Sequence, residues 1–324
     1  METIRDVTGA TTSSFIAVEI GGTKLQVCAG TGNGRILETC RFAVNRSRGA
    51  EGVQEQILEG LSQLIPKWKP LAVGVGYGGP VNWQTGRIWR SYHLEGWSEF
   101  ALGEWLAEQS GLPTYVDNDA NVAALGEAIC GAGAECDPVF YVTLGSGVGG
   151  GLVIQRQIYH GIFPGESEIG HLLMDEKGSI VEDHCSGWSV DQRIRKVIEE
   201  SPTSALSVMV GKDKGGEAKY LSEAVAKNDP KACPILEELA QSLALALSHV
   251  IHLLHPKIII LGGGLSLIGE PLRASVQAQL AKKVMDAFQD TTRIALSQLK
   301  EAAVPTGGLI MAAQRHVFLS QNKP

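Results

Sequence analysis

Short apolar runs alternate with glycine-rich turns along the chain. Residues 15–20 and 25–29 are apolar runs that flank the turn Gly21-Gly22-Thr23-Lys24, a pattern that predicts a β-hairpin. The same pattern recurs with apolar runs at 140–144 and 152–154 around a second glycine-rich turn. Two similar supersecondary units suggest an internally duplicated chain with two lobes.

Amphipathic segments separate further apolar runs. Apolar residues three and four positions apart predict helices, and short β-branched runs that end in glycine turns predict strands. This alternation is typical of an α/β protein, in which ligands collect where strand ends meet such turns. The predicted helices cover 52–64, 100–110, 120–130 and 235–254, and the predicted strands cover 71–75, 114–116 and 257–261.

Composition excludes several classes of protein. The chain has 324 residues, 44% hydrophobic and 19% charged, which is enough for about two domains and too apolar for a disordered tail. The net charge of -7, without a basic run, argues against a nucleic acid partner. The sequence has neither the pattern of a secretory signal nor an apolar stretch long enough to span a membrane, so we expect a cytoplasmic protein without a membrane partner.

Glycine is over-represented, with 39 of 324 positions against a usual share of about 7%. The turns at 21–22, 145–151 and 262–264 are candidate phosphate cradles, because residues without a Cβ let backbone N–H groups converge on an anion. Plain hairpin turns are the alternative. A strand-like run follows the pattern Gly145-x-Gly147-x-x-Gly150, which argues against a dinucleotide site.

Two polar groups are candidates for chemistry on a sugar alcohol. Asp119 stands between a predicted strand and a predicted helix, with Asn118 and Asn121 beside it. A carboxylate there can take a proton from a hydroxyl while the amides bind neighbouring hydroxyls, and a plain helix N-cap is the alternative. Glu168 and His171 form the second group, for which ordinary surface residues are the alternative.

A set of ordered motifs makes the chain resemble the ROK family, the group of repressors, open reading frames and sugar kinases, over about residues 15 to 315. The resemblance implies an α/β, two-lobed ribonuclease-H-like (actin-like ATPase) fold with the active site in the interdomain cleft. We expect a small domain at 1–119, completed by a C-terminal helix at 304–324, and a large domain at 120–303. The motifs are Glu19-Ile-Gly-Gly-Thr-Lys24, Gly78-Gly-Pro-Val81, Gly96-Trp97, Asp117-Asn-Asp-Ala-Asn121, Leu144-Gly-Ser-Gly-Val-Gly-Gly150, Glu168-Ile-Gly-His171 and Ile259-Ile-Leu-Gly-Gly-Gly264.

The resemblance implies an ATP-dependent hexose kinase that uses Mg²⁺ and transfers the γ-phosphoryl group to a sugar hydroxyl, with O6 of glucose or a related hexose as the first candidate. Asp119 matches the general base of the family. The implied sugar ligands are Gly79, Asn118, Asp119, Glu168, His171 and Glu182. The implied nucleotide ligands are Glu19, Gly21, Gly22, Thr23, Lys24, Gly145, Ser146, Gly147, Gly262, Gly263 and Gly264.

Three departures from the family pattern bear on these roles. Glu19 stands where many members have Asp, so a contact between this carboxylate and the metal stays open. The glycine-containing turn expected at 304–308 lacks an acidic pair. The segment 172–181, which in the family supplies cysteines for a structural zinc, contains none, and the nearest thiol is Cys185. Two ligands cannot complete a tetrahedral site, so we predict no structural zinc and a His171 that is available to the sugar.

Two other functions are alternatives to the kinase. The segment before residue 15 is short and not basic, which disfavours a DNA-binding regulator with an N-terminal helix-turn-helix module. A sensor of the same family that binds sugar or nucleotide without catalysis stays open as the alternative. A homodimer is expected from the resemblance alone.

Overall fold

The computed structural model describes residues 13–22, 24–44, 48–91, 96–163, 165 and 167–321. The described residues form two compact units. The first unit takes its residues from 1–131, 156–166 and 301–324, and the second from 132–155 and 167–300. The domain boundaries expected from the sequence stay a prediction, because compactness does not show which segments fold independently.

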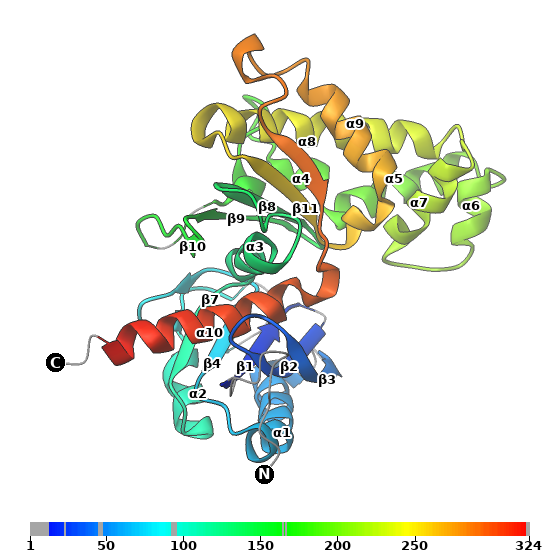
Figure 1. The fold of residues 1–324 in the computed structure, drawn as a ribbon. Coiled ribbons are helices and arrows are strands. Elements are labelled where there is room, and N and C mark those ends of the chain that lie inside the picture. The colour runs from blue at the N-terminus through cyan, green and yellow to red at the C-terminus, as the bar shows by residue number, and fades with distance from the viewer. Residues whose placement is uncertain are drawn as a thin grey trace. The chain divides into compact units, whose positions relative to one another are not determined.

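The first unit is built on a mixed five-stranded sheet of order β3-β2-β1-β4-β7. Strands β1, β2 and β3 pair antiparallel, whereas β1, β4 and β7 pair parallel (Figure 1). The strands are β1 (Ser14–Ile20), β2 (Lys24–Thr31), β3 (Ile36–Ala43), β4 (Val73–Tyr77) and β7 (Thr114–Asn118), and a small hairpin consists of β5 (Val81–Asn82) and β6 (Arg87–Ile88).

Alternate side chains of β1 serve two cores. Ile16 and Val18 pack in a cluster with residues of α1 (Gly49–Trp68) and α2 (Leu102–Ser110), while Phe15 and Ala17 pack with residues of α10 (Ala303–Gln321). Because successive residues of a strand point to opposite faces, this apolar run is buried on both sides. Helix α10 lies across β1 and β4 and against α3 (Asp119–Cys130) (Figure 1).

The second unit repeats this plan with strands in the order β9-β8-β11-β12, which corresponds to β2-β1-β4-β7 of the first sheet. Strands β8 and β9 are antiparallel, and β8, β11 and β12 are parallel, so the two sheets share one topology, as the repeated sequence pattern predicts. The strands are β8 (Val139–Leu144), β9 (Val148–Ile154), β11 (Ile258–Gly262) and β12 (Arg293–Leu296). The short strand β10 (Gln157–Ile158) belongs to the first unit.

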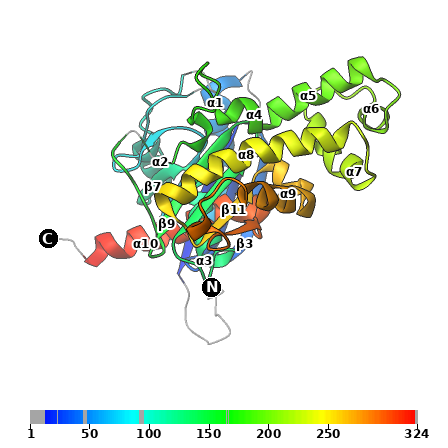
Figure 2. The ribbon, with the colours of Figure 1, turned by 90° about the horizontal axis from the view of Figure 1, so that it is seen from above.

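Helix α8 is the long buried helix of this unit and packs against α4, α7 and α9 (Figure 2). It ends at Leu254, where His255 adopts a left-handed conformation one residue before Pro256. The helices are α4 (Val181–Cys185), α5 (Gly187–Glu200), α6 (Ala205–Val210), α7 (Leu221–Ala226), α8 (Ala232–Leu254) and α9 (Glu270–Leu280), with the 3-10 helices η2 (Ile169–His171), η3 (Glu217–Tyr220), η4 (Gly264–Ile268), η5 (Asp286–Phe288) and η6 (Lys300–Ala302).

Two glycine-rich segments expected to be turns are regular structure. Strand β9 begins at Val148, so only the first glycines of 145–151 lie in a turn. The turn expected at 304–308 is part of α10. A Cβ on Gly307 would lie 1.8 Å from the carbonyl oxygen of Val122 in α3, so glycine here allows two helices to approach closely. Part of the glycine excess therefore serves helix packing.

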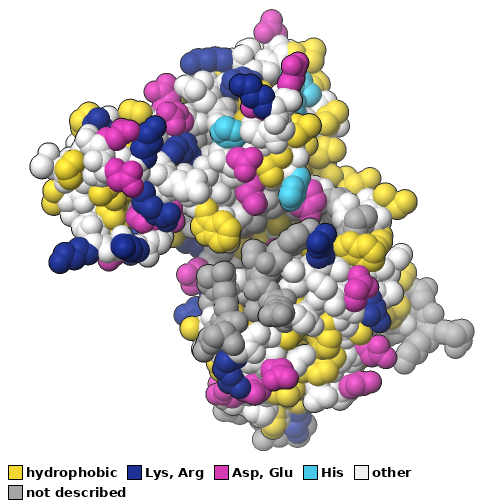
Figure 3. Space-filling model, turned by 180° about the vertical axis from the view of Figure 1, so that it is seen from behind, with side chains coloured by type: hydrophobic (Ala, Val, Ile, Leu, Met, Phe, Trp, Pro, Cys, Tyr) yellow, Lys and Arg dark blue, Asp and Glu magenta, His cyan; other side chains and the backbone are white. Residues whose placement is uncertain are grey.

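The surface carries charged side chains of both signs, as the composition indicates. Basic and acidic side chains are interspersed among the coloured residues of the face shown in Figure 3. Within the described residues, no helix is both long and apolar enough to cross a membrane.

Candidate active site

The parallel strands of the first sheet end in register. Ile20 pairs with Tyr77, and Tyr77 pairs with Asn118, so β1, β4 and β7 finish at the same edge of the sheet. The backbone N–H of Gly78 donates to the carbonyl of Ile20 at 2.9 Å. A Cβ on Gly78 would lie 3.3 Å from Oδ2 of Asp119. The first glycine turn, the Gly78 loop and the Asp119 carboxylate are thus brought together.

Asn118, and not Asp119, caps helix α3. Its Oδ1 accepts the backbone N–H groups of Ala120 at 2.9 Å and Asn121 at 3.4 Å. Its Nδ2 donates to the carbonyl of Gly79 at 3.1 Å, which ties the Gly78 loop to the helix start. Asp119 is the first residue of α3, where the positive end of the helix dipole favours a carboxylate. The N-cap alternative for Asp119 is therefore wrong.

Tyr77 is a residue of this site that the sequence did not single out. Its side chain is 3% exposed, and burial raises the pKa of its phenol, with the charge of Asp119 acting in the same direction. The phenol therefore lies within electrostatic reach of the Asp119 carboxylate. The only signal in the sequence is its position at the end of a short strand, which many core tyrosines share.

The first turn carries a half-buried ion pair. Nζ of Lys24 lies 3.3 Å from Oε1 of Glu19, and Nε2 of Gln26 donates to Oε2 of Glu19 at 2.6 Å. Burial raises the pKa of Glu19, while Lys24 and Gln26 work in the opposite direction. Both carboxylate oxygens of Glu19 therefore have partners within the hairpin. In the turn itself, Gly21 donates its N–H to the carbonyl of Lys24 at 3.0 Å.

Gly22 and Thr23 are two further predicted nucleotide ligands in this turn. Gly22 is half-buried beside Gly21, and Thr23 lies outside the described residues.

In the second unit, the turn between β8 and β9 is held by two helices. The N–H of Gly187, at the start of α5, donates to the carbonyl of Gly145 at 2.7 Å. Oε2 of Glu182 in α4 accepts the N–H of Val148 at 2.8 Å, and a Cβ on Gly147 would lie 2.5 Å from this oxygen. Glu182, expected as a sugar ligand, thus binds the glycine turn, and Gly147 leaves the space that this contact needs.

Glu168, His171 and Glu182 lie close enough to influence one another. Burial raises the pKa of Glu168; the charge of His171 lowers it and the charge of Glu182 raises it. Glu168 precedes the 3-10 helix η2, and His171 ends it as an exposed residue. The structure therefore brings this predicted group together in one unit.

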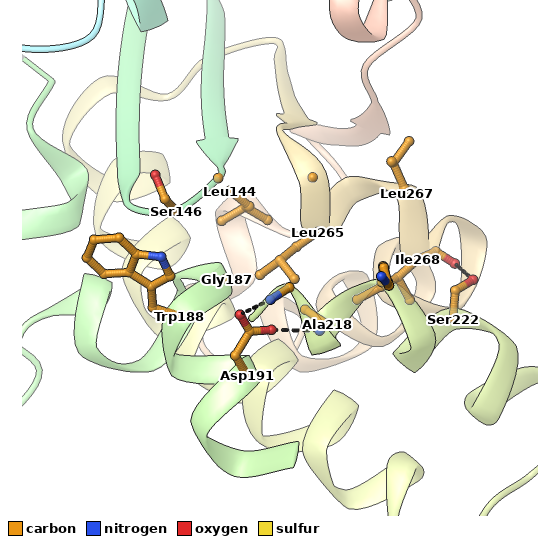
Figure 4. Close-up of a pocket in the computed structure, with 14 residues that line it drawn as sticks. Leu144, Ser146, Gly187, Trp188, Asp191, Ala218, Ser222, Leu265, Leu267 and Ile268 are labelled. Carbon is orange, nitrogen blue, oxygen red and sulfur yellow. Dashed lines mark hydrogen bonds between the residues drawn. The ribbon is translucent and has the colours of Figure 1, made fainter. Parts of the chain in front are cut away.

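A pocket of about 490 Å³ opens beside the glycine turn of the second unit (Figure 4). Trp188, 55% exposed, and Ser146 lie at one end, and Leu267 and Ile268 lie at the other. The lining comprises backbone-rich turns and apolar side chains, with few polar groups: Leu144, Gly145, Ser146, Gly187, Trp188, Asp191, Gly216, Ala218, Lys219, Ser222, Gly264, Leu265, Leu267 and Ile268.

The three glycines at 262–264 have different tasks. A Cβ on Gly262 would lie 2.0 Å from the hydroxyl oxygen of Tyr141, and one on Gly263 would lie 2.5 Å from the backbone of Leu144. Both therefore make room for packing within the unit. Only Gly264 of the three lines the pocket, and its Cβ position has no atom within 4 Å. Backbone there is open to a ligand.

An acidic clamp fixes one wall of this pocket. Asp191 in α5 accepts the N–H groups of Gly216 at 3.0 Å and Ala218 at 2.7 Å (Figure 4). Arg195 donates two hydrogen bonds to Glu217, at 2.8 and 3.0 Å, and lowers the pKa of that buried carboxyl to about 2. The sequence could not identify this clamp, because its two sides come from separate elements.

Comparison with known proteins identifies the family of this chain. The sequence model of the ROK family matches residues 15–315. The chain belongs to the ROK family. A glucokinase of Halalkalibacterium halodurans is 28% identical, over 95% of this chain and 98% of that protein. A xylose repressor of Caldicellulosiruptor bescii is 24% identical, over 74% of this chain and 62% of that protein.

A solved structure shares the fold of this ROK protein. The crystal structure of a ROK family glucokinase from Streptomyces griseus in complex with glucose and AMPPNP has a TM-score of 0.83 and 29% identity, and covers 93% of this chain and 100% of that chain. The expected fold class, α/β and two-lobed ribonuclease-H-like, is confirmed. The glucokinase relatives support a sugar kinase, while the repressor relative shows that the family also includes regulators.

The segment 172–181 of this ROK protein, where a zinc ligand set was expected to be missing, is closed by its own hydrogen bonds. Leu173 and Ile180 form a β-bridge, and Asp175 accepts the N–H of Ser179 at 3.2 Å and its hydroxyl at 2.8 Å. Burial raises the pKa of the Cys185 thiol to about 12, which disfavours the thiolate that a metal needs. Among the described residues, no three His, Cys, Asp or Glu side chains are grouped to hold a metal. The absence of zinc stays a prediction.

Proposed function

We propose that the chain is an ATP-dependent hexose kinase that transfers the γ-phosphoryl group of ATP to a sugar hydroxyl, with O6 of glucose or a related hexose as the first acceptor to test. The observation that carries the proposal is the common edge of β1, β4 and β7. It sets the Asp119 carboxylate beside Gly78 and one residue from the Asn118 cap, a suitable arrangement for deprotonating a bound hydroxyl.

In this mechanism Asp119 is the general base and takes the proton of the attacking hydroxyl. A positioned base contributes about 10² to 10⁴ in rate. Asn118 and Gly79 in the Gly78 loop would bind sugar hydroxyls beside Asp119. Glu168 and His171 would bind further hydroxyls of the sugar. Glu182 would act on the sugar in part through the glycine turn, since its Oε2 accepts the N–H of Val148.

The pocket of the second unit would take the nucleotide. Trp188 and Leu265 offer apolar surface to adenosine, and the turn from Gly145 to Gly147 offers backbone N–H groups to the phosphates. The S. griseus glucokinase complex contains AMPPNP, which supports ATP as the donor.

Mg²⁺, when bound with ATP, neutralises phosphate charge and so assists phosphoryl transfer. Mg²⁺ prefers oxygen ligands and keeps several waters, so one carboxylate near the first turn is enough for its coordination. Glu19 would be the candidate for that carboxylate, but its two oxygens already contact Lys24 and Gln26. We therefore propose that Glu19 orients Lys24 toward phosphate, and that any contact between Glu19 and the metal is made through water.

The test is ADP release from Mg·ATP across a panel of hexoses, followed by NMR identification of the phosphorylated hydroxyl. We expect Asp119→Asn to keep sugar binding and to lose turnover by at least about a hundredfold. The control is Asp286→Asn at an exposed acid of η5, which should keep normal turnover. Sugar-dependent thermal stabilisation of the unchanged protein without ADP release would contradict the kinase and support the sensor.

We also propose a homodimer in the cytoplasm, as the resemblance to the family implies. Light scattering coupled to gel filtration measures the mass in solution, and a monomeric mass at micromolar concentration would contradict it.

A further inference from the structure

Asp117 is a buried carboxylate immediately before Asn118 and Asp119. The residue is 1% exposed at the end of β7. Its Oδ1 accepts the N–H of Asn118 at 2.9 Å and Nδ2 of Asn121 at 3.1 Å. These two bonds fix the chain on either side of Asp119, across the first turn of α3.

The second oxygen of Asp117 meets two groups that can carry positive charge. Nε2 of His160 lies 2.7 Å from Oδ2, and Nη2 of Arg315 lies 3.6 Å from the same oxygen. His160 follows β10, and Arg315 belongs to α10, so both come from segments far from β7 in the sequence. A buried carboxylate is costly unless it is paired and hydrogen-bonded, and these partners supply that pairing.

Trp83 orients both partners of Asp117. Its indole stacks on the His160 ring at 4.2 Å and 20°, and the guanidinium carbon of Arg315 lies 4.6 Å from the indole centre. Trp83 belongs to the hairpin that follows the Gly78 loop, and the Gly79 carbonyl of that loop accepts a hydrogen bond from Asn118. The cluster of Trp83, His160, Arg315 and Asp117 therefore encloses the strand end that leads to Asp119.

We propose that His160 and Arg315 are positioning residues for the general base, acting on Asp119 through Asp117. This inference rests on the proposed function for the role of Asp119. His160 and Arg315 hold Oδ2 of Asp117. Oδ1 of Asp117 therefore stays in place to accept its two hydrogen bonds, from the N–H of Asn118 and from Nδ2 of Asn121. A displacement of about 1 Å at a reacting group can cost about a hundredfold in rate, so small movements of this turn would be visible in kcat.

The test compares two replacements of His160. Leucine keeps much of the volume but has no donor, whereas glutamine keeps an N–H donor near the position of Nε2. We expect His160→Leu to lower kcat by at least about tenfold with the KM for ATP unchanged within about twofold, and His160→Gln to retain more than about a third of kcat. The control is Gln314→Ala, which removes the contact of α10 with the Arg156 carbonyl without touching Asp117 and should keep normal kcat.

The same replacement made in an Asp119→Asn protein distinguishes a positioning role of His160 from a general loss of structure. If His160 acts through the base, His160→Leu should cost little in an Asp119→Asn protein, because the group that it positions is already gone. The same fold loss in both backgrounds, or an unchanged kcat in the Asp119-containing protein, would overturn the inference. If His160→Leu does not fold, Arg315→Lys is the substitute, since it keeps the charge but loses the planar contact with Trp83.

Hydrogen exchange tests the same inference without turnover. The amides of Ala120 and Asn121 should exchange at least about fivefold faster in His160→Leu than in His160→Gln, and equal rates would overturn the inference. Failure of the proposed function is distinguishable, because it would appear as absent ADP release from the unchanged protein.

Discussion

Replacing Glu217 by glutamine tests the clamp at the wall of the pocket in the second unit. Glu217 is 1% exposed, and its pKa falls from an ordinary 4.5 to about 2. The largest cause is the pair of hydrogen bonds from Arg195; burial acts in the opposite direction, and the N–H of Gly215 adds a further bond. The folded protein therefore stabilises the charged carboxylate relative to the unfolded chain.

The free energy of unfolding follows from this lowering. Each pH unit by which the folded pKa is lowered is worth about 1.4 kcal/mol, so Glu217 contributes ~3 kcal/mol at pH 7. The sign is that of a depressed carboxyl: the contribution is complete above pH 4.5 and is lost as the pH falls through 4.5 toward 2. At pH 3 we expect about half of the value at pH 7.

The assay follows the second unit alone, because a chain with two compact units need not unfold in one step. Hydrogen exchange of peptides from 187–200, measured by mass spectrometry across a urea titration, gives the free energy of unfolding for the protein with and without Glu217→Gln. The control is Glu200→Gln in α5, the helix whose exchange is measured; it breaks an exposed 3.9 Å ion pair with Lys196 and should change stability by less than about 0.5 kcal/mol.

Two outcomes would refute this account. A loss below about 1 kcal/mol at pH 7 would mean that Arg195 does not stabilise the carboxylate as the geometry indicates. An equal loss at pH 7 and pH 3 would mean that packing, and not charge, explains the effect.

Three further measurements test other parts of the structure. Gly307→Ala should destabilise the protein by about 1 to 3 kcal/mol in thermal unfolding, since its Cβ would enter the α3 backbone, whereas Gly264→Ala should leave stability nearly unchanged; equal stability of the two variants would contradict the close helix crossing. Trp188→Ala should weaken ATP binding by about tenfold in calorimetry, and an unchanged affinity would remove the indole from the nucleotide site. Cys185 should resist iodoacetamide at pH 8 until urea is added, because burial raises the pKa of its thiol to about 12, and labelling as fast as the half-exposed Cys233 would contradict its burial.

Elements with strong local signals were predictable. The apolar runs around Gly21 and the second hairpin, the helix after Asp119 and the long helix that ends before Pro256 all follow from spacing and from glycine or proline at their ends. The resemblance implied a helix at 304–324, and the structure has one there. The glycine-containing turn expected at 304–308 was wrong, because the two adjacent glycines, which usually break a helix, lie inside α10. Its helical conformation is decided by the close approach to α3, a contact that local propensity does not contain.

In the candidate site, too, some features were predictable from the sequence and others were not. The motif around Asn118 and Asp119 was visible in the sequence. The sequence indicated an N-cap alternative only at Asp119, whereas Asn118 caps the helix, and both residue types cap well. The role of Glu182 at the glycine turn and the role of Gly262 in packing were not predictable, because each depends on an atom contributed by another element.

The amino-acid sequence by itself determined the α/β alternation, the duplicated hairpins, the family and the polar motifs at strand ends, because these are local patterns of spacing and residue type. Only the tertiary structure decided that β1, β4 and β7 end in register, that Glu217 pairs with Arg195, and that His160 and Arg315 meet Asp117. The physical reason is that hydrogen bonds and ion pairs act over a few ångströms in space, whereas the partners are separated by tens to hundreds of residues along the chain.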